Sequence, residues 1–305
     1  MNNKINHPKK QHYVPQFLLR NFKSREGDYI WCYDKQDNRI FESNIIRIAS
    51  ENYFYDFING SHEHSLEEEL SQIEAETSLI IYKIISNNTL SVLSTSEKEK
   101  LAHFVSIQIF RTKNSYEKLK HFKENFRDLL EIPLNTHLDA VHTKNSFLTM
   151  LQEIKDVILI LMNKFWYLLE SNNNFLISDN PVVLQNNYNQ SSVRGTLGLK
   201  SIGIEIYLPL SKNIILCLLC SEIYDRLKKI TTEDAIVNDF IIQVNSKNPA
   251  SCKPENIQNI NSLQVISSER FIFSSTNNFS LVEDMIKDDS ELKKGPRHIF
   301  GSGIK

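Results

Sequence analysis

The sequence predicts an α+β protein in which one sheet packs on three or more long helices. Short runs of aromatic and β-branched residues, typical of strands, occur in two batches, one before residue 50 and one after residue 170. The residues between them carry apolar side chains at helical spacing. Because strands and helices are segregated along the chain, α+β is favoured over a regular βαβ alternation. The sheet is therefore expected to join an N-terminal hairpin to strands from the C-terminal half.

The N-terminal part is predicted to form a short helix and then the hairpin. Pro15 suits the first turn of a helix, where its missing N–H costs nothing, so residues 16–22 are expected to be helical. Residues 29–33 and 40–46 are aromatic and β-branched, and the polar residues 34–38 between them are typical of a hairpin loop.

Three long helices are predicted in the middle of the chain. The first follows an apolar stripe from Leu66 to Ile84. The second begins near Thr95, with Thr95 or Ser96 as its N-cap, and continues or restarts as far as residue 130. The third is expected over residues 145–169 and ends in an aromatic run. The helices and that run are expected to share one core that contains Ile73, Phe104, Phe165, Trp166 and Leu169.

The C-terminal half returns to strand patterns. Strands are expected near residues 175–184, 204–208 and 214–219, a helix over 222–244, and one or two further strands within 262–275. The predicted organisation is a flexible N-terminus over residues 1–10, a single domain over 11–286 and an exposed tail over 287–305.

Composition places the chain among ordinary globular proteins. Of its 305 residues, 41% are apolar and 24% charged, and the net charge is -2, so no global field indicates a nucleic-acid or membrane partner. No apolar run reaches the roughly 18 residues of a membrane span, and the first ten residues lack the apolar region of a secretory signal. Four cysteines make no disulfide framework in a chain of this length. We therefore expect a cytoplasmic protein with no membrane partner.

The familiar catalytic motifs are missing from the sequence. It has no phosphate-binding glycine loop, no HExxH and no GxSxG. Cys217 and Cys220 have CxxC spacing, but they lie in an apolar strand-like run, which favours buried structural thiols over a zinc or redox site.

Three polar islands in apolar surroundings are the candidate functional residues. His12 can act as acid, base or ligand, or simply form a structural hydrogen bond. Gln108 and Arg111 continue the core-facing stripe of a helix, so the guanidinium needs a carboxylate or an anion. Glu67 and Glu74 lie along one edge of the preceding helix, and Glu74 is the better candidate for that carboxylate. The third island, residues 178–181, is a polar kink between apolar strands and is either a turn or a site.

An ordered set of motifs resembles one bacterial family of unknown function, the domain-of-unknown-function family 4238. The set consists of HYVPQFLLRNF with His12, Pro15, Leu19 and Phe22, then Gln108-Ile-Phe-Arg111-Thr112, Trp166, FLISDNPV from Phe175, and Tyr207-Leu-Pro-Leu-Ser211. The resemblance extends from His12 to Ser211 and, more weakly, to Ser275. It implies positions and no reaction. Such proteins resemble accessory genes scattered through bacterial genomes, among them defence and toxin-like cargo, and the resemblance makes His12 a site candidate.

Two hypotheses from different classes follow. In the first, the protein is a nuclease-like phosphodiester hydrolase, in which His12 is the acid or base and Arg111 holds a phosphate. Asp179 with Glu74 then activates water directly or through a divalent metal such as Mg²⁺, with Gln108 and Asn180 beside them. The segment 111–127, with six Lys and Arg against two Glu, is the expected nucleic-acid contact and includes Lys113, Lys118, Lys120, Lys123 and Arg127. Against this hypothesis, Tyr207 stands where many metal nucleases have lysine, and no RxxxxH pattern occurs.

In the second hypothesis, the protein is a non-catalytic binding or regulatory protein, and the polar islands are a structural hydrogen-bond network. Both hypotheses expect the islands to converge, because an unpaired buried polar group costs roughly 1–3 kcal/mol and the islands are the nearest partners for one another. The sequence leaves the oligomeric state open.

Overall fold

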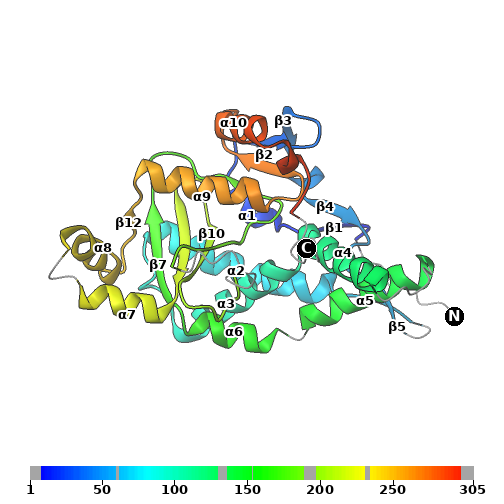
Figure 1. The fold of residues 1–305 in the computed structure, drawn as a ribbon, viewed down its shortest axis with the longest axis horizontal. Coiled ribbons are helices and arrows are strands. Elements are labelled where there is room, and N and C mark those ends of the chain that lie inside the picture. The colour runs from blue at the N-terminus through cyan, green and yellow to red at the C-terminus, as the bar shows by residue number, and fades with distance from the viewer. Residues whose placement is uncertain are drawn as a thin grey trace.

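A computed structural model of the chain describes residues 8–59, 62–129, 136–152, 154–188, 197–230 and 234–296. It confirms the α+β class, with helices gathered around two larger sheets (Figure 1). The expected single sheet is wrong in one respect, because the strands divide between these two sheets and two short strand pairs.

The larger sheet has five strands in the order β12-β7-β11-β10-β9. The pairs β7–β11, β11–β10 and β10–β9 are antiparallel, whereas β12 pairs with β7 in parallel. The bounds are β7 Phe165–Glu170, β9 Val183–Asn186, β10 Ile204–Pro209, β11 Ile214–Leu219 and β12 Ala250–Ser251. Nearly all of β11 is buried, as expected for a central strand covered on both faces.

The second sheet joins the N-terminal hairpin to later strands, as the sequence predicts. Its order is β3-β2-β13-β8, and all its pairs are antiparallel. The bounds are β2 Tyr29–Asp34, β3 Arg39–Asn44, β8 Ile177–Ser178 and β13 Phe271–Ser274. The short pairs are β1 Lys10–His12 with β4 Ser50–Asn52, and β5 Asp56–Asn59 with β6 His62–Ser65.

The helices are shorter and more numerous than the sequence pattern indicates. Their bounds are α1 Gln16–Arg20, α2 Glu67–Asn87, α3 Thr95–Phe110, α4 Lys113–Leu129, α5 Thr136–Gln152, α6 Lys155–Met162, α7 Ser221–Lys229, α8 Ala235–Asn245, α9 Pro254–Ser267 and α10 Ser280–Asp288, with 3-10 turns η1 Ile45–Arg47 and η2 Ser290–Lys293. Ser94, rather than Thr95 or Ser96, caps α3, in a reciprocal capping box with Glu97.

The element predictions for residues 145–169 and 262–275 are wrong in part. In place of one helix over 145–169, the structure has the end of α5 and then α6, which ends at Met162, and the aromatic tail is strand β7. Residues 165–170 alternate between the two faces of the sheet, a period-2 pattern that a short apolar run hides. Of the one or two strands expected within 262–275, one is present as β13, whereas residues 262–267 continue α9.

The two faces of the five-stranded sheet belong to different cores. Trp166 and Leu168 point into the larger core with Phe104, and Ile73 packs against it. Phe165 and Leu169 point to the opposite face, which α7, α8 and α9 cover (Figure 1). The prediction of one core for all five residues is therefore wrong, since neighbouring residues of a strand face opposite sides.

Within the described ranges, no helix is long and apolar enough to cross a membrane. All four cysteines are buried and free. Residues 1–7 and 297–305 lie outside the described residues, so the flexible N-terminus and the exposed tail stay predictions. Lys10 already belongs to strand β1, and η2 follows α10 closely.

Candidate functional site

Arg111 is the centre of a buried polar cluster at the C-terminal end of α3. Only 1% of the residue is exposed, and its guanidinium donates in three directions. Nε donates to the Tyr55 hydroxyl at 3.0 Å, Nη1 to Glu74 Oε1 at 2.7 Å and Nη2 to the His12 carbonyl at 2.6 Å. Glu74 is thus the carboxylate that the sequence predicts for Arg111. The cluster ties β1, α2 and the loop before β5 to the end of α3.

The charge of Arg111 is held by its partners. Burial alone lowers the pKa of the guanidinium, but the hydrogen bonds and the attraction of Tyr55 and Glu74 more than offset it, so the pKa is raised. Tyr55 is fully buried, and burial raises the pKa of its hydroxyl. A charged guanidinium with a carboxylate, a hydroxyl and a carbonyl around it has little room for an incoming phosphate.

His12 contributes its backbone to this cluster rather than its ring. The imidazole Nδ1 lies 3.4 Å from Gln16 Nε2, while the buried Nε2 forms no hydrogen bond in the described part of the chain. Burial, together with the charges of Lys10 and Arg111, lowers the pKa of His12 to about 4, although the carbonyls of Ile45 and Ile46 oppose this shift. The ring is therefore neutral at pH 7.

Gln108 and Asn180 link the same helix end to other elements. Gln108, fully buried on α3, donates to the Tyr13 carbonyl at 3.0 Å. Thr112, the residue after Arg111, donates to Asn180 Oδ1 at 2.9 Å. Asn180 in turn donates to the Ser267 carbonyl at 3.1 Å, at the end of α9. This chain joins the Arg111 cluster to the SDNP kink.

Asp179 is held by backbone amides. Its carboxylate accepts from the N–H groups of Glu269, Arg270 and Phe271 at 2.7–2.8 Å, so it fastens the turn before β13. The residue is 1% exposed. Burial raises the pKa of Asp179 to about 6, opposed by these amides and by Lys35. Three of the roughly four hydrogen bonds that a carboxylate can accept are thus used by the fold.

The predicted residues are joined in one network, but as a chain of contacts rather than around one cavity. His12, Gln108, Arg111 and Glu74 form one half, and Asp179 and Asn180 form the other. The two carboxylates proposed for a metal, Asp179 and Glu74, fall in different halves. Over the described residues, no three His, Cys, Asp or Glu side chains are grouped so that they could hold a metal ion. The donor set therefore does not fit a Mg²⁺ site.

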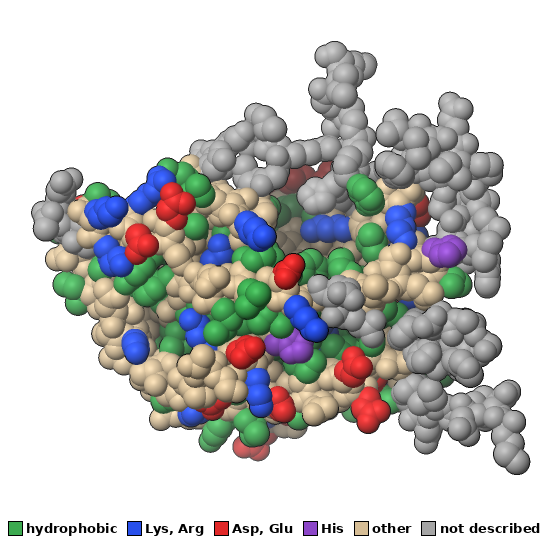
Figure 2. All heavy atoms as spheres, turned by 90° about the horizontal axis from the view of Figure 1, so that it is seen from below, with side chains coloured by type: hydrophobic (Ala, Val, Ile, Leu, Met, Phe, Trp, Pro, Cys, Tyr) green, Lys and Arg blue, Asp and Glu red, His purple; other side chains and the backbone are tan. Residues whose placement is uncertain are grey.

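The predicted basic contact lies on α4, and part of it is engaged in the fold. Lys113 pairs with Glu51, and Lys123 donates to the His142 carbonyl and the Ser146 hydroxyl on α5. Lys120 is exposed on the same helix and Lys118 is half-buried. The side chain of Arg127 lies outside the described residues. On the face in Figure 2, basic and acidic side chains are interspersed.

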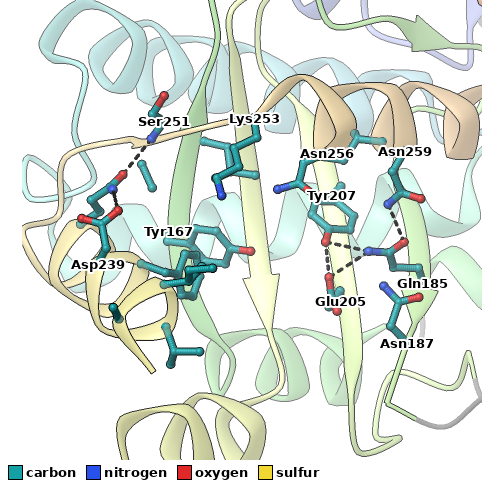
Figure 3. Close-up of a pocket in the computed structure, with 18 residues that line it drawn as sticks. Tyr167, Gln185, Asn187, Glu205, Tyr207, Asp239, Ser251, Lys253, Asn256 and Asn259 are labelled. Carbon is teal, nitrogen blue, oxygen red and sulfur yellow. Dashed lines mark hydrogen bonds between the residues drawn. The ribbon is translucent and has the colours of Figure 1, made fainter. Parts of the chain in front are cut away.

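A cleft of about 700 Å³ opens over the five-stranded sheet, on the face that α8 and α9 cover. Strands β7, β9 and β10 form its floor, and α8, β12 and α9 form its walls (Figure 3). None of the polar residues predicted from the sequence lines it. Its volume falls within the roughly 300–1,000 Å³ of typical small-molecule sites.

One end of the cleft floor is a chain of hydrogen bonds that ends on a carboxylate. Asn259 on α9 donates to Gln185 Oε1, and Gln185 Nε2 donates to both Glu205 Oε2 and the Tyr207 hydroxyl, each at 3.0 Å. The Tyr207 hydroxyl donates to the same Glu205 oxygen. Tyr207 is 5% exposed, and burial and the charge of Glu205 raise its pKa, so it remains a donor.

The other end of the cleft is largely apolar. Tyr167 and Phe240 meet edge to face with ring centroids 5.5 Å apart, and Leu169, Ile236 and Ala250 lie beside them. Asp239 stands on the α8 wall, and its carboxylate accepts from Gln243 at 2.6 Å. Between the two ends, Lys253 points its ammonium into the cleft near the Tyr167 hydroxyl (Figure 3).

A further cleft of about 680 Å³ lies between α2, α3 and α6. Its lining is mainly leucine and isoleucine, with Glu69, Glu99, His103 and Lys155 as polar members. It holds fewer convergent polar groups than the cleft over the sheet.

Sequence reasoning missed the cleft over the sheet, although a signal exists. Glu205 and Tyr207 alternate with the buried residues Ile204, Ile206 and Leu208 in β10. Gln185 on the neighbouring strand β9 faces the same cleft. Polar side chains on one face of an otherwise buried strand indicate a wet face. Tyr55 and Lys253, by contrast, lie in stretches without a periodic pattern.

One comparison with known proteins gave a match. The family model described as "Protein of unknown function (DUF4238)" matches residues 10–278. No curated protein and no solved structure matches the chain.

Proposed function

The chain belongs to the DUF4238 family of proteins of unknown function, and we propose that it is a ligand-binding protein whose site is the cleft between α8 and α9. One observation carries the proposal: polar side chains with unfilled hydrogen-bonding capacity converge on this open cleft, whereas the predicted catalytic residues are engaged mainly with backbone groups and with other buried side chains. Sites for small molecules combine an apolar lining with a few convergent polar groups, and this cleft has both.

In this proposal the buried network is structural. Arg111, Asp179 and Asn180 each bind backbone groups of distant segments, and such networks fix how elements pack. The nuclease hypothesis instead needs a histidine and a carboxylate that reach one substrate atom. His12 and Asp179 are directed to different partners, so the contacts favour the binding protein over the hydrolase.

Ligand-induced stabilisation tests the proposal. Wild-type protein is heated with separate collections of amino acids, nucleotides, sugars and organic acids. A compound present at about 100 times its Kd stabilises by about 2.7 kcal/mol, which raises Tm by several degrees. We expect at least one compound to do this and to lose its effect in Asn256→Trp, because the exposed Asn256 lines the cleft and an indole there fills it.

Gln258→Trp is the matched control, since Gln258 is exposed on the same helix but does not line the cleft. The proposal fails if no compound stabilises the wild type, or if stabilisation persists in Asn256→Trp. A parallel gel assay of nucleic-acid cleavage, with and without Mg²⁺, addresses the hydrolase. Cleavage that disappears in folded His12→Ala and Asp179→Ala proteins would establish the hydrolase instead.

A further inference from the structure

The cleft over the sheet contains one cation, Lys253, and two carboxylates, Glu205 and Asp239, and none of the three has an ionic partner among the described residues. Glu205 contacts only the neutral donors Gln185 and Tyr207, both through Oε2, so Oε1 is left for a ligand. Among the described residues, no carboxylate lies within ion-pair distance of Lys253. Its ammonium points into the cleft (Figure 3). The two side chains also form no ion pair with each other.

The groups around these charges differ in character along the cleft. Figure 3 shows Tyr167 on one side of Lys253 and Glu205 with its amide neighbours on the other. Phe240 meets Tyr167 edge to face, and Leu169 also lines the cleft, so the side with Tyr167 is the apolar end. Asp239 is a third charge in the lining, but it stands on the opposite wall and is exposed, with Gln243 as its donor. The order along the cleft is therefore apolar surface, cation and then anion.

We infer that the cleft binds a small zwitterion with an apolar side group, the chemical class of the hydrophobic α-amino acids. This inference rests on the proposed function of the cleft. The apolar group packs against Tyr167 and Phe240, the carboxylate accepts from Lys253, and the ammonium donates to Glu205. Each charge of the ligand then meets the uncompensated charge of opposite sign, and charge complementarity of this kind selects among ligands of similar size.

The chemistry of the floor favours this class over nucleotides. A nucleoside monophosphate brings a doubly charged phosphate, for which the cleft supplies one lysine and two carboxylates. A zwitterion adds no net charge, so neither Glu205 nor Asp239 repels it. Gln185 and Tyr207 both donate to Oε2 of Glu205, so Oε1 remains as an acceptor for an ammonium.

Calorimetric titration with matched ligands tests the inference. L-Phenylalanine is compared with phenethylamine, which lacks the carboxylate, and 3-phenylpropionate, which lacks the ammonium. We expect each analogue to bind about tenfold or more weakly, because each loses one charge-assisted hydrogen bond. In Glu205→Gln, phenylalanine should fall to the affinity of 3-phenylpropionate, whose own affinity stays unchanged. The amide still accepts from Tyr207, so the floor is preserved.

Lys253→Met should give the converse result, in which phenylalanine falls to the affinity of phenethylamine. Lys287→Met and Asp284→Asn are the controls, because both residues are exposed on α10 and neither lines the cleft, and both variants should bind phenylalanine as the wild type does. The inference is overturned if Glu205→Gln and Lys253→Met leave phenylalanine binding unchanged. It also fails if a nucleotide or sugar, but no amino acid, binds and is blocked by Asn256→Trp; in that outcome the proposed function survives. If no compound binds to the cleft of the wild type, both the inference and the proposed function fail.

Discussion

Replacing Arg111 with methionine is the sharpest perturbation of the buried network. Methionine fills much of the same volume but removes the donors to Tyr55, Glu74 and the His12 carbonyl. The Tyr55 hydroxyl is 3.4 Å from the same carbonyl and can satisfy it in part, whereas the Glu74 carboxylate is left at the edge of the core with 24% of its side chain exposed.

The expected loss of unfolding free energy is about 3–5 kcal/mol, the usual result of removing one partner of a buried ion pair. Each buried group left without a partner costs about 1–3 kcal/mol, and the partial exposure of Glu74 keeps the total near the lower bound. Lys100→Met is the matched control. It breaks an ion pair with Glu76 in which both side chains are nearly half exposed, and should cost at most about 0.5 kcal/mol.

Urea unfolding followed by circular dichroism and by tryptophan fluorescence measures both variants. Coincident transitions and an unchanged m-value show that the two-state treatment holds. An Arg111→Met protein that loses less than about 1 kcal/mol would refute the structural role, because a buried network of this kind cannot be cut without cost. Loss of an activity at unchanged stability would show that Arg111 serves function.

Three further predictions concern His12, Asp179 and Trp166. The pKa of His12 is lowered from 6.5 to about 4, so between these pH values the unfolded chain binds the proton more readily than the folded chain does. The contribution of His12 to stability is therefore lost as pH falls from 6.5 to about 4. A pH series of urea midpoints should show this slope, worth up to about 2 kcal/mol for a partly exposed ring, and His12→Gln should remove it. The pKa of Asp179 is raised from 3.8 to about 6, so the free energy of unfolding should fall as pH rises through this range. This slope, opposite in sign to that of His12, should be visible in the His12→Gln protein. It should disappear when Asp179→Asn is added. Trp166→Ala should cost about 3–5 kcal/mol by thermal or urea unfolding, since the indole is buried and donates to the Leu161 carbonyl; an unchanged Tm would contradict its place in the core.

The sequence indicates the fold class and most elements because periodicity is a local property. The N-terminal hairpin, α2 and α3 follow patterns that extend over many residues. Strand β7 was missed because residues 165–169 are all apolar, and a continuous apolar run fits a buried helix as well as a strand. The end of α9 was missed because Asn261 and Gln264 hold distant backbone segments from the inner face of a helix, a tertiary effect without a local pattern.

The candidate site divides in the same way. The pairing of Arg111 with Glu74 could be predicted, because a guanidinium on a core-facing stripe needs a carboxylate and the preceding helix supplies one. Whether such a cluster is open or closed depends on residues such as Tyr55 and Phe271, which come from other parts of the chain. The cleft is harder still to predict, since β7, β9, β10, α8 and α9, which form it together, lie far apart in the sequence.

The location of a bound small molecule tests the central claim most directly. A crystal of the protein soaked with the compound that raises Tm most would show where that compound lies. We predict difference density between α8 and α9, in contact with Tyr167 and Glu205. Density at Arg111 and Asp179, with the buried network opened around it, would contradict the account.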